Sequence, residues 1–146
     1  MLTINPNNLL WDKSRDINQQ RELVLLTATV YLEARGESRT GKIAVAYVIM
    51  NRYRNKRRFP NTIQGVILQK YQFSSWNDYW YYKKAFDPAI KVWEECLEAA
   101  LVAYLGTEDD PTNGADHFWS PKYTTPLWAK DYAYIDIKNH RFIKIY

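Results

Sequence analysis

The stretch GKIAVAYVIMNR, residues 41–52, decides the fold of this chain. Every residue from Ile43 to Met50 is apolar or aromatic. A helix that is apolar all round its circumference is normally buried, so we predict that this segment is the central helix of the core. Ser38 or Thr40 is suited to cap its start. Asn51–Arg52 then place polar groups where the core ends.

A second helix is predicted just before this stretch. Ser14 or Asp16 could cap its start, and Gly36 is a stop signal after about Arg35. Its apolar positions recur at helical spacing: Leu23, Leu26, Val30 and Ala34. Glu33 therefore falls in the last turn, beside an apolar stripe and near the negative end of the helix dipole. Both features would raise the pKa of the Glu33 carboxyl.

A carboxyl with a raised pKa can act as a general acid at neutral pH, and Glu33 in YLEARGE, residues 31–37, has the setting for this. The pattern alone leaves another reading, a helix-end glutamate in a salt bridge with Arg35 or Arg39. Glu37 could be a second catalytic carboxylate. A structural role near the start of the next helix is the alternative for Glu37, because Gly36 interrupts the helix between the two glutamates.

The remaining segments predict a short helix after Asn61 or Thr62, a loop at QFSSW (72–76), and a helix opened by Asp87–Pro88 and ended by Gly106. A loop covers 107–121, with turn chemistry at Asp110–Pro111 and Asn113–Gly114.

Alternating apolar and polar residues on both sides of Lys138–Asn139 predict a β-hairpin. The expected fold class is α+β: one mostly helical, lysozyme-like domain over 1–146, with an N-terminal arm at 1–13 and a small antiparallel sheet.

Composition narrows the function. The six Trp and twelve Tyr suit stacking on flat ligands such as sugars or bases. The net charge of +4 suits an anionic partner. The basic run Arg52–Arg58 is either a solvated helix end or a phosphate contact. A single Cys excludes an intrachain disulfide, and with only two His it argues against a protein zinc site.

Several motifs in one order carry a resemblance. They are YLEARGE, GKIAVAYVIMNR, FPNTIQGVILQKYQFS, DPTNGADHFWSP, then Trp128 and NHRF. Over residues 23–143 the chain resembles the SleB-like cell wall hydrolase family of spore cortex-lytic enzymes. The resemblance implies a lysozyme-like domain that cuts peptidoglycan between N-acetylmuramic acid and N-acetylglucosamine as a lytic transglycosylase, with Glu33 as its catalytic residue and no cofactor or metal.

The same resemblance and the chemistry of the side chains give the candidate substrate-binding residues. An amide or hydroxyl can bind N-acetyl or hydroxyl groups, and rings can pack on sugar faces. The set is Gln72, Phe73, Ser74, Asn51, Tyr31, His117, Trp119 and Trp128. For Phe73, Asn51 and Trp119 the alternatives are a loop anchor, a helix cap and a core ring. His140 is predicted to be structural.

The start of the chain has no basic region followed by an apolar stretch, and no run is long enough to span a membrane. We expect a monomeric bacteriophage or prophage lysis enzyme that is made in the cytoplasm and reaches peptidoglycan once the membrane is permeabilised. The alternatives are a hydrolytic muramidase or glucosaminidase, a wall-binding module without activity, and a nucleic-acid-binding module. The last is disfavoured because no common nucleic-acid motif is present.

Overall fold

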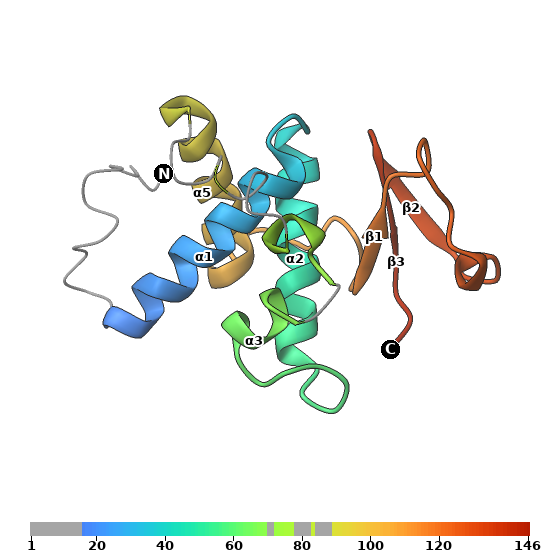
Figure 1. Cartoon of the computed structure of the whole chain (residues 1–146), viewed down its shortest axis with the longest axis horizontal. Coiled ribbons are helices and arrows are strands. Elements are labelled where there is room, and N and C mark those ends of the chain that lie inside the picture. The colour runs from blue at the N-terminus through green and yellow to red at the C-terminus, as the bar shows by residue number, and fades with distance from the viewer. Residues whose placement is uncertain (1–15, 70–71, 78–82, 84–88) are drawn as a thin grey trace.

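The computed structural model describes residues 16–69, 72–77, 83 and 89–146. Helices form one side of the molecule, and a small sheet built from the C-terminal part of the chain forms the other (Figure 1). The predicted arm at 1–13 and the predicted cap at Asp87–Pro88 lie outside the described residues. The elements in chain order are α1 (Ile17–Ala34), α2 (Arg39–Arg54), α3 (Ile63–Ile67), η2 (Ser74–Trp76), α5 (Ile90–Leu105), β1 (His117–Trp119), η4 (Leu127–Ala129), β2 (Tyr134–Ile137) and β3 (His140–Ile143).

The start of α1 is held by a capping box. The Asp16 carboxylate accepts hydrogen bonds from the backbone N–H groups of Asn18 and Gln19, at 2.8 and 2.9 Å. The Gln19 side chain accepts in return from the Asp16 backbone. These contacts satisfy donors that a helix start otherwise leaves unpaired. Asp16 is thus the cap, and α1 ends at Ala34 with Arg35 as its C-cap, as predicted.

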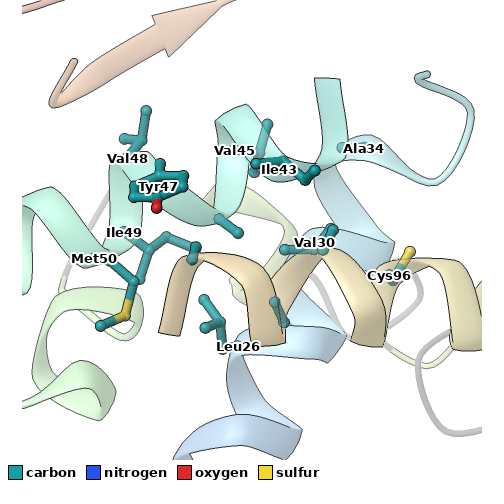
Figure 2. Close-up of a cluster of buried hydrophobic side chains, with 14 of the residues drawn as sticks. Leu26, Val30, Ala34, Ile43, Val45, Tyr47, Val48, Ile49, Met50 and Cys96 are labelled. Atoms are coloured by element: carbon teal, nitrogen blue, oxygen red, sulfur yellow. The ribbon is translucent and has the colours of Figure 1, made fainter. Parts of the chain in front are cut away.

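Helix α2 is the central helix of the core, as its apolar run predicted. Ser38 caps its start by accepting from the Gly41 backbone N–H, and every residue from Gly41 to Met50 is buried. Figure 2 shows side chains of α1, α2 and α5 meeting in one cluster, with Cys96 of α5 among them. The Cys96 side chain is fully buried.

The β-strands form an antiparallel sheet in the order β1-β3-β2. The hairpin turns at Lys138–Asn139 as predicted, and Lys138 takes a φ of 49° there. Strand β1 was predicted as loop, and that prediction is wrong. His117–Trp119 is extended because it pairs with β3, Phe118 opposite Phe142, so the strand depends on a partner far along the chain rather than on its own pattern.

Two loop predictions were right and one needs correcting. Gly106 ends α5 in the left-handed conformation, at φ 67°. Asp110 closes its turn by accepting from the N–H groups of Thr112 and Gly114. The QFSSW segment is not wholly loop, because Ser74–Trp76 forms a 3-10 turn. Within the described residues, no helix is long and apolar enough to cross a membrane.

Candidate active site

Glu33 lies in the last turn of α1 and is partly buried. Ser75 Oγ donates a hydrogen bond of 2.6 Å to Glu33 Oε1, and the Ser75 side chain is itself buried. Burial raises the pKa of the Glu33 carboxyl, and the Ser75 hydroxyl lowers that pKa in part. The carboxyl therefore holds its proton to a higher pH than an exposed glutamate does.

The salt-bridge alternative for Glu33 is wrong in the described part of the chain. Arg39 pairs with Glu98 at 2.9 Å and with Glu108. The Arg35 guanidinium lies over the Tyr31 ring, 5.6 Å from its centroid. Among the described residues Glu33 has no ion pair, so no cation there offsets the effect of burial on its pKa.

The segment 72–77 brings Ser75 to the end of α1. Phe73 is buried, and the Trp76 indole N–H donates to Thr29 Oγ1 of α1 at 3.0 Å. These two anchors hold the 3-10 turn against the helix. Sequence reasoning named Ser74, whose side chain lies outside the described residues, and missed Ser75. Adjacent serines carry no signal in the sequence for which of them faces the carboxyl.

A buried arginine that sequence reasoning also missed as a site residue organises the next part of the site. Arg52 Nε donates to the Asp116 carbonyl oxygen at 2.6 Å, and Arg52 Nη1 donates to Gln72 Oε1 at 2.8 Å. The rings of Phe59 and Phe73 lie 5.2 and 5.4 Å from the guanidinium carbon. Burial lowers the pKa of Arg52 to about 10, with the Asp116 charge acting against that shift, so Arg52 stays positively charged at neutral pH.

Asp116 forms hydrogen bonds with the last residues of the chain and with His117. Its carboxylate accepts from the N–H groups of Ile145 and Tyr146, at 2.8 and 2.9 Å, and lies 2.8 Å from His117 Nδ1. Burial works against ionisation of Asp116, but the hydrogen bonds from His117, Ile145 and Tyr146 outweigh it and hold the pKa of Asp116 below its ordinary value. The carboxylate thereby fixes both the His117 ring and the end of the chain.

A pocket of about 530 Å³ opens beside the Arg52–Gln72 pair. It contains four of the predicted binding residues. Trp128 is half exposed, and its ring meets His117 and Trp119 edge-on at 5.4 and 6.0 Å. The lining residues are Arg52, Gln72, His117, Phe118, Trp119, Pro126, Trp128, Tyr132, Ile145 and Tyr146. Glu33 does not line this pocket. Ser75, which bonds Glu33, lies three residues after Gln72, which does line it.

The other candidate binding residues lie elsewhere. Tyr31 is buried, its ring 6.1 Å from Trp93. Asn51 donates to Asp110 and to the Ala115 carbonyl, at 2.8 and 2.9 Å, and so holds the loop before β1. Phe73 packs in the core. The structure thus gives these three side chains packing or loop-holding contacts and does not place them on the pocket lining.

Glu37 is bound by the hairpin turn between β2 and β3. Its carboxylate accepts from the Asn139 side-chain amide at 3.0 Å, which ties the start of α2 to the hairpin turn. The His140 ring, next in the chain, is partly buried, and its centroid lies 5.1 Å from that of the Phe118 ring. Contacts of this kind are what structural roles would require, and the part of either residue in activity stays a prediction.

Arg52 is the one basic side chain of the run Arg52–Arg58 that is buried. Arg54 donates to the carbonyl of Ala103. Arg58 lies over the Tyr146 ring, 4.8 Å from its centroid. Arg54, Lys56, Arg57 and Arg58 are exposed, so the phosphate-contact alternative for this run stays a prediction.

This chain belongs to the cell wall hydrolase family, whose family model matches residues 36–143. Glu33 lies just before the matched segment, so its assignment depends on its own geometry. Among curated proteins, the chain is 36% identical to the spore cortex-lytic enzyme of Bacillus cereus over 109 residues, which are 75% of this chain and 38% of that protein. It is 36% identical to the enzyme of the same description from Bacillus subtilis over 107 residues, 73% of this chain and 32% of that protein.

Solved structures give the same fold. The catalytic domain of the germination-specific lytic transglycosylase SleB from Bacillus anthracis matches with a TM-score of 0.71 and 32% identity, over 90% of this chain and 98% of that one. The catalytic domain of Bacillus cereus SleB matches with a TM-score of 0.72 and 35% identity, over 86% and 91%. The predicted α+β fold class is confirmed. The chain spans less than two fifths of the length of the curated relatives it matches.

Proposed function

We propose that this domain cleaves the glycan strands of peptidoglycan as a lytic transglycosylase, with Glu33 as its acid and base. The observation that carries the proposal is the Glu33 carboxyl itself. Its pKa is raised by burial, Ser75 holds one of its oxygens, and no described cation pairs with it. Membership of the cell wall hydrolase family supports the substrate class, and the SleB catalytic domains of the same fold support the reaction type.

The proposed reaction uses one carboxyl twice. Protonated Glu33 first gives its proton to the glycosidic oxygen between N-acetylmuramic acid and N-acetylglucosamine as the bond from that oxygen to the anomeric carbon breaks. The Glu33 carboxylate then takes the proton of the muramic C6 hydroxyl, whose oxygen bonds to the same anomeric carbon. The products are a 1,6-anhydro sugar and a shortened strand, and Glu33 ends protonated again.

The position of Glu37 supports intramolecular attack over hydrolysis. Most glycosidases that activate water use a second carboxylate across the scissile bond, and Glu37 is the sequence neighbour that could have supplied one. Its carboxylate is bound to Asn139 of the hairpin turn instead. Ser75 suits the one-glutamate scheme because its hydroxyl stabilises the carboxylate form that has to act as the base.

We assign strand binding to the aromatic pocket. Trp119, Trp128 and His117 offer ring faces and edges of the kind that pack on sugars. Gln72 lines the same pocket, and its amide oxygen accepts a hydrogen bond from Arg52. Gln72 of this pocket and Ser75, which bonds Glu33, belong to the same segment 72–77.

Mass spectrometry of the fragments released from purified peptidoglycan tests the proposal. Wild type should release anhydro-muropeptides, Glu33→Gln should release none, and Glu37→Gln should behave as wild type. Reducing-end products would replace the transglycosylase by a hydrolytic muramidase or glucosaminidase. If wild type sediments with peptidoglycan but releases nothing, the domain is a wall-binding module instead.

The role in bacteriophage lysis stays a prediction. It implies that the chain, produced alone in a bacterial cytoplasm, leaves cells intact. Production together with a protein that permeabilises the membrane should then cause lysis, and Glu33→Gln should prevent it. Lysis without the permeabilising protein would argue against this role.

A further inference from the structure

The contact between Arg52 and Gln72 fixes which end of the Gln72 amide is bound by Arg52 and which end is left for another partner. A guanidinium carries hydrogen-bond donors only, so the Gln72 atom 2.8 Å from Arg52 Nη1 has to be the amide oxygen. The two N–H donors of the Gln72 amide then point the other way. The Gln72 side chain is exposed and lines the pocket, and its amide nitrogen makes no hydrogen bond to the described residues.

Arg52 cannot turn to release this amide. Its side chain is 4% exposed, and its Nε is held by the Asp116 carbonyl at 2.6 Å. The rings of Phe59 and Phe73 flank the guanidinium plane. The amide of Gln72 is therefore set by a rigid partner, as a recognition group requires.

Two donors set in this way call for an acceptor on the ligand. We propose that Gln72 binds the acetamido carbonyl oxygen of a sugar in the pocket, and that Arg52 is the positioning residue that orients Gln72 for it. The inference rests on the proposed function and deepens it by naming the group that the pocket reads. A 2-acetamido group occurs on both sugars of peptidoglycan, so this contact would distinguish its strands from unsubstituted glucans.

Charge favours a neutral carbonyl over a carboxylate of the peptide stem. The positive charge of Arg52 is already offset by the negative charge of Asp116, which lies close enough to act on it. This corner of the pocket therefore carries donors without a net charge in need of an anion. The rings of Trp119 and Trp128, also in the lining, can pack on the methyl group and the sugar face.

The test measures KM and kcat on glycan strands that an amidase has freed of peptides, with anhydro ends counted by mass spectrometry. Gln72→Glu keeps the oxygen toward Arg52 and replaces the donor side by an acceptor. It should raise KM by about 10- to 100-fold and change kcat by less than about threefold, because an unmade hydrogen bond and a facing lone pair weaken binding. Gln64→Glu adds the same charge on the exposed face of α3 and should match wild type.

Two further arms identify the group and the positioning role. On strands whose acetyl groups have been removed, each sugar carries an ammonium group that the introduced carboxylate attracts, so wild type should lose its KM advantage over Gln72→Glu. Arg52→Lys keeps the charge but cannot hold both the Asp116 carbonyl and the amide, so its KM should lie between those of wild type and Gln72→Glu. Thermal melting checks that each variant is folded. If Arg52→Lys does not fold, the comparison of Gln72→Glu with wild type still tests the inference.

The outcomes separate cleanly. A KM for Gln72→Glu equal to that of Gln64→Glu overturns the inference. So does a loss confined to peptide-bearing peptidoglycan, which would assign the contact to a stem carboxylate. If wild type cuts neither intact peptidoglycan nor peptide-free strands, the proposed function has failed before the variants are compared. A loss on peptide-free strands that vanishes on deacetylated ones establishes the inference.

Discussion

Replacing Ser75 by alanine should move the alkaline limit of activity to higher pH. The Ser75 hydroxyl donates to Glu33 Oε1 at 2.6 Å, and this bond favours the ionised form of the carboxyl. A hydrogen bond to a charged group contributes roughly 1.5–3 kcal/mol. Its loss should raise the ratio of protonated to ionised Glu33 by roughly 10- to 100-fold at a given pH.

The sign follows from the role proposed for Glu33. The reaction begins with the protonated carboxyl, so kcat/KM falls as pH rises through the pKa of Glu33. Burial has already raised that pKa, and Ser75→Ala removes what holds it down. At a pH where wild type keeps about a tenth of its optimum, the variant should keep about half of its own or more.

The assay is the release of soluble muropeptides from purified peptidoglycan across a pH series. Ser74→Ala is the matched control, since it removes the neighbouring hydroxyl and tests the serine that the sequence had suggested. The maximal rate of Ser75→Ala should also fall, because the base form of Glu33 loses its partner. An alkaline limit that stays in place or moves to lower pH refutes the reasoning.

Three further outcomes are expected. Glu37→Gln should keep activity within about twofold and cost less than about 1 kcal/mol of unfolding free energy, measured by urea titration, because the Glu37 carboxylate bonds the exposed Asn139 amide. Glu33→Gln should raise the melting temperature at neutral pH by a few degrees, about 1 kcal/mol. Burial disfavours the ionised form in the folded state, so this gain should shrink as pH falls and disappear below the ordinary value of 4.5. Asp116→Asn should lower the free energy of unfolding at neutral pH by about 1–3 kcal/mol in the same urea titration, because it weakens the acceptor for His117, Ile145 and Tyr146. The pKa of Asp116 is lowered in the folded state, so wild type should lose this advantage as pH falls below about 3.8.

Local chemistry made much of the fold predictable. Asp16, Ser38 and Thr62 all cap helices because a capping side chain acts on backbone groups within three residues. The central helix followed from its apolar run. Strand β1 could not be found in this way, because its extended form depends on pairing with β3, and Phe118 meets Phe142 across a gap in sequence that no local pattern spans.

The same difference between local contacts and contacts distant in sequence applies to the site. The apolar flank on its own helix made Glu33 a candidate, and the family resemblance selected it over a salt-bridged helix-end glutamate. Ser75 and Arg52 act through contacts to residues 42 and 20 positions away, Glu33 and Gln72. Neither contact leaves a trace in the nearby sequence, so only the folded chain reveals which hydroxyl and which guanidinium serve the site.

Cys96 has a practical consequence for this fold. The side chain is fully buried among α1, α2 and α5, and burial raises the pKa of its thiol to about 12. Only the thiolate reacts with alkylating reagents, and at neutral pH it makes up on the order of one molecule in 100,000. The rate at which such a reagent labels this sole cysteine therefore measures how often the helical core opens. Unfolding can thus be followed without an engineered probe.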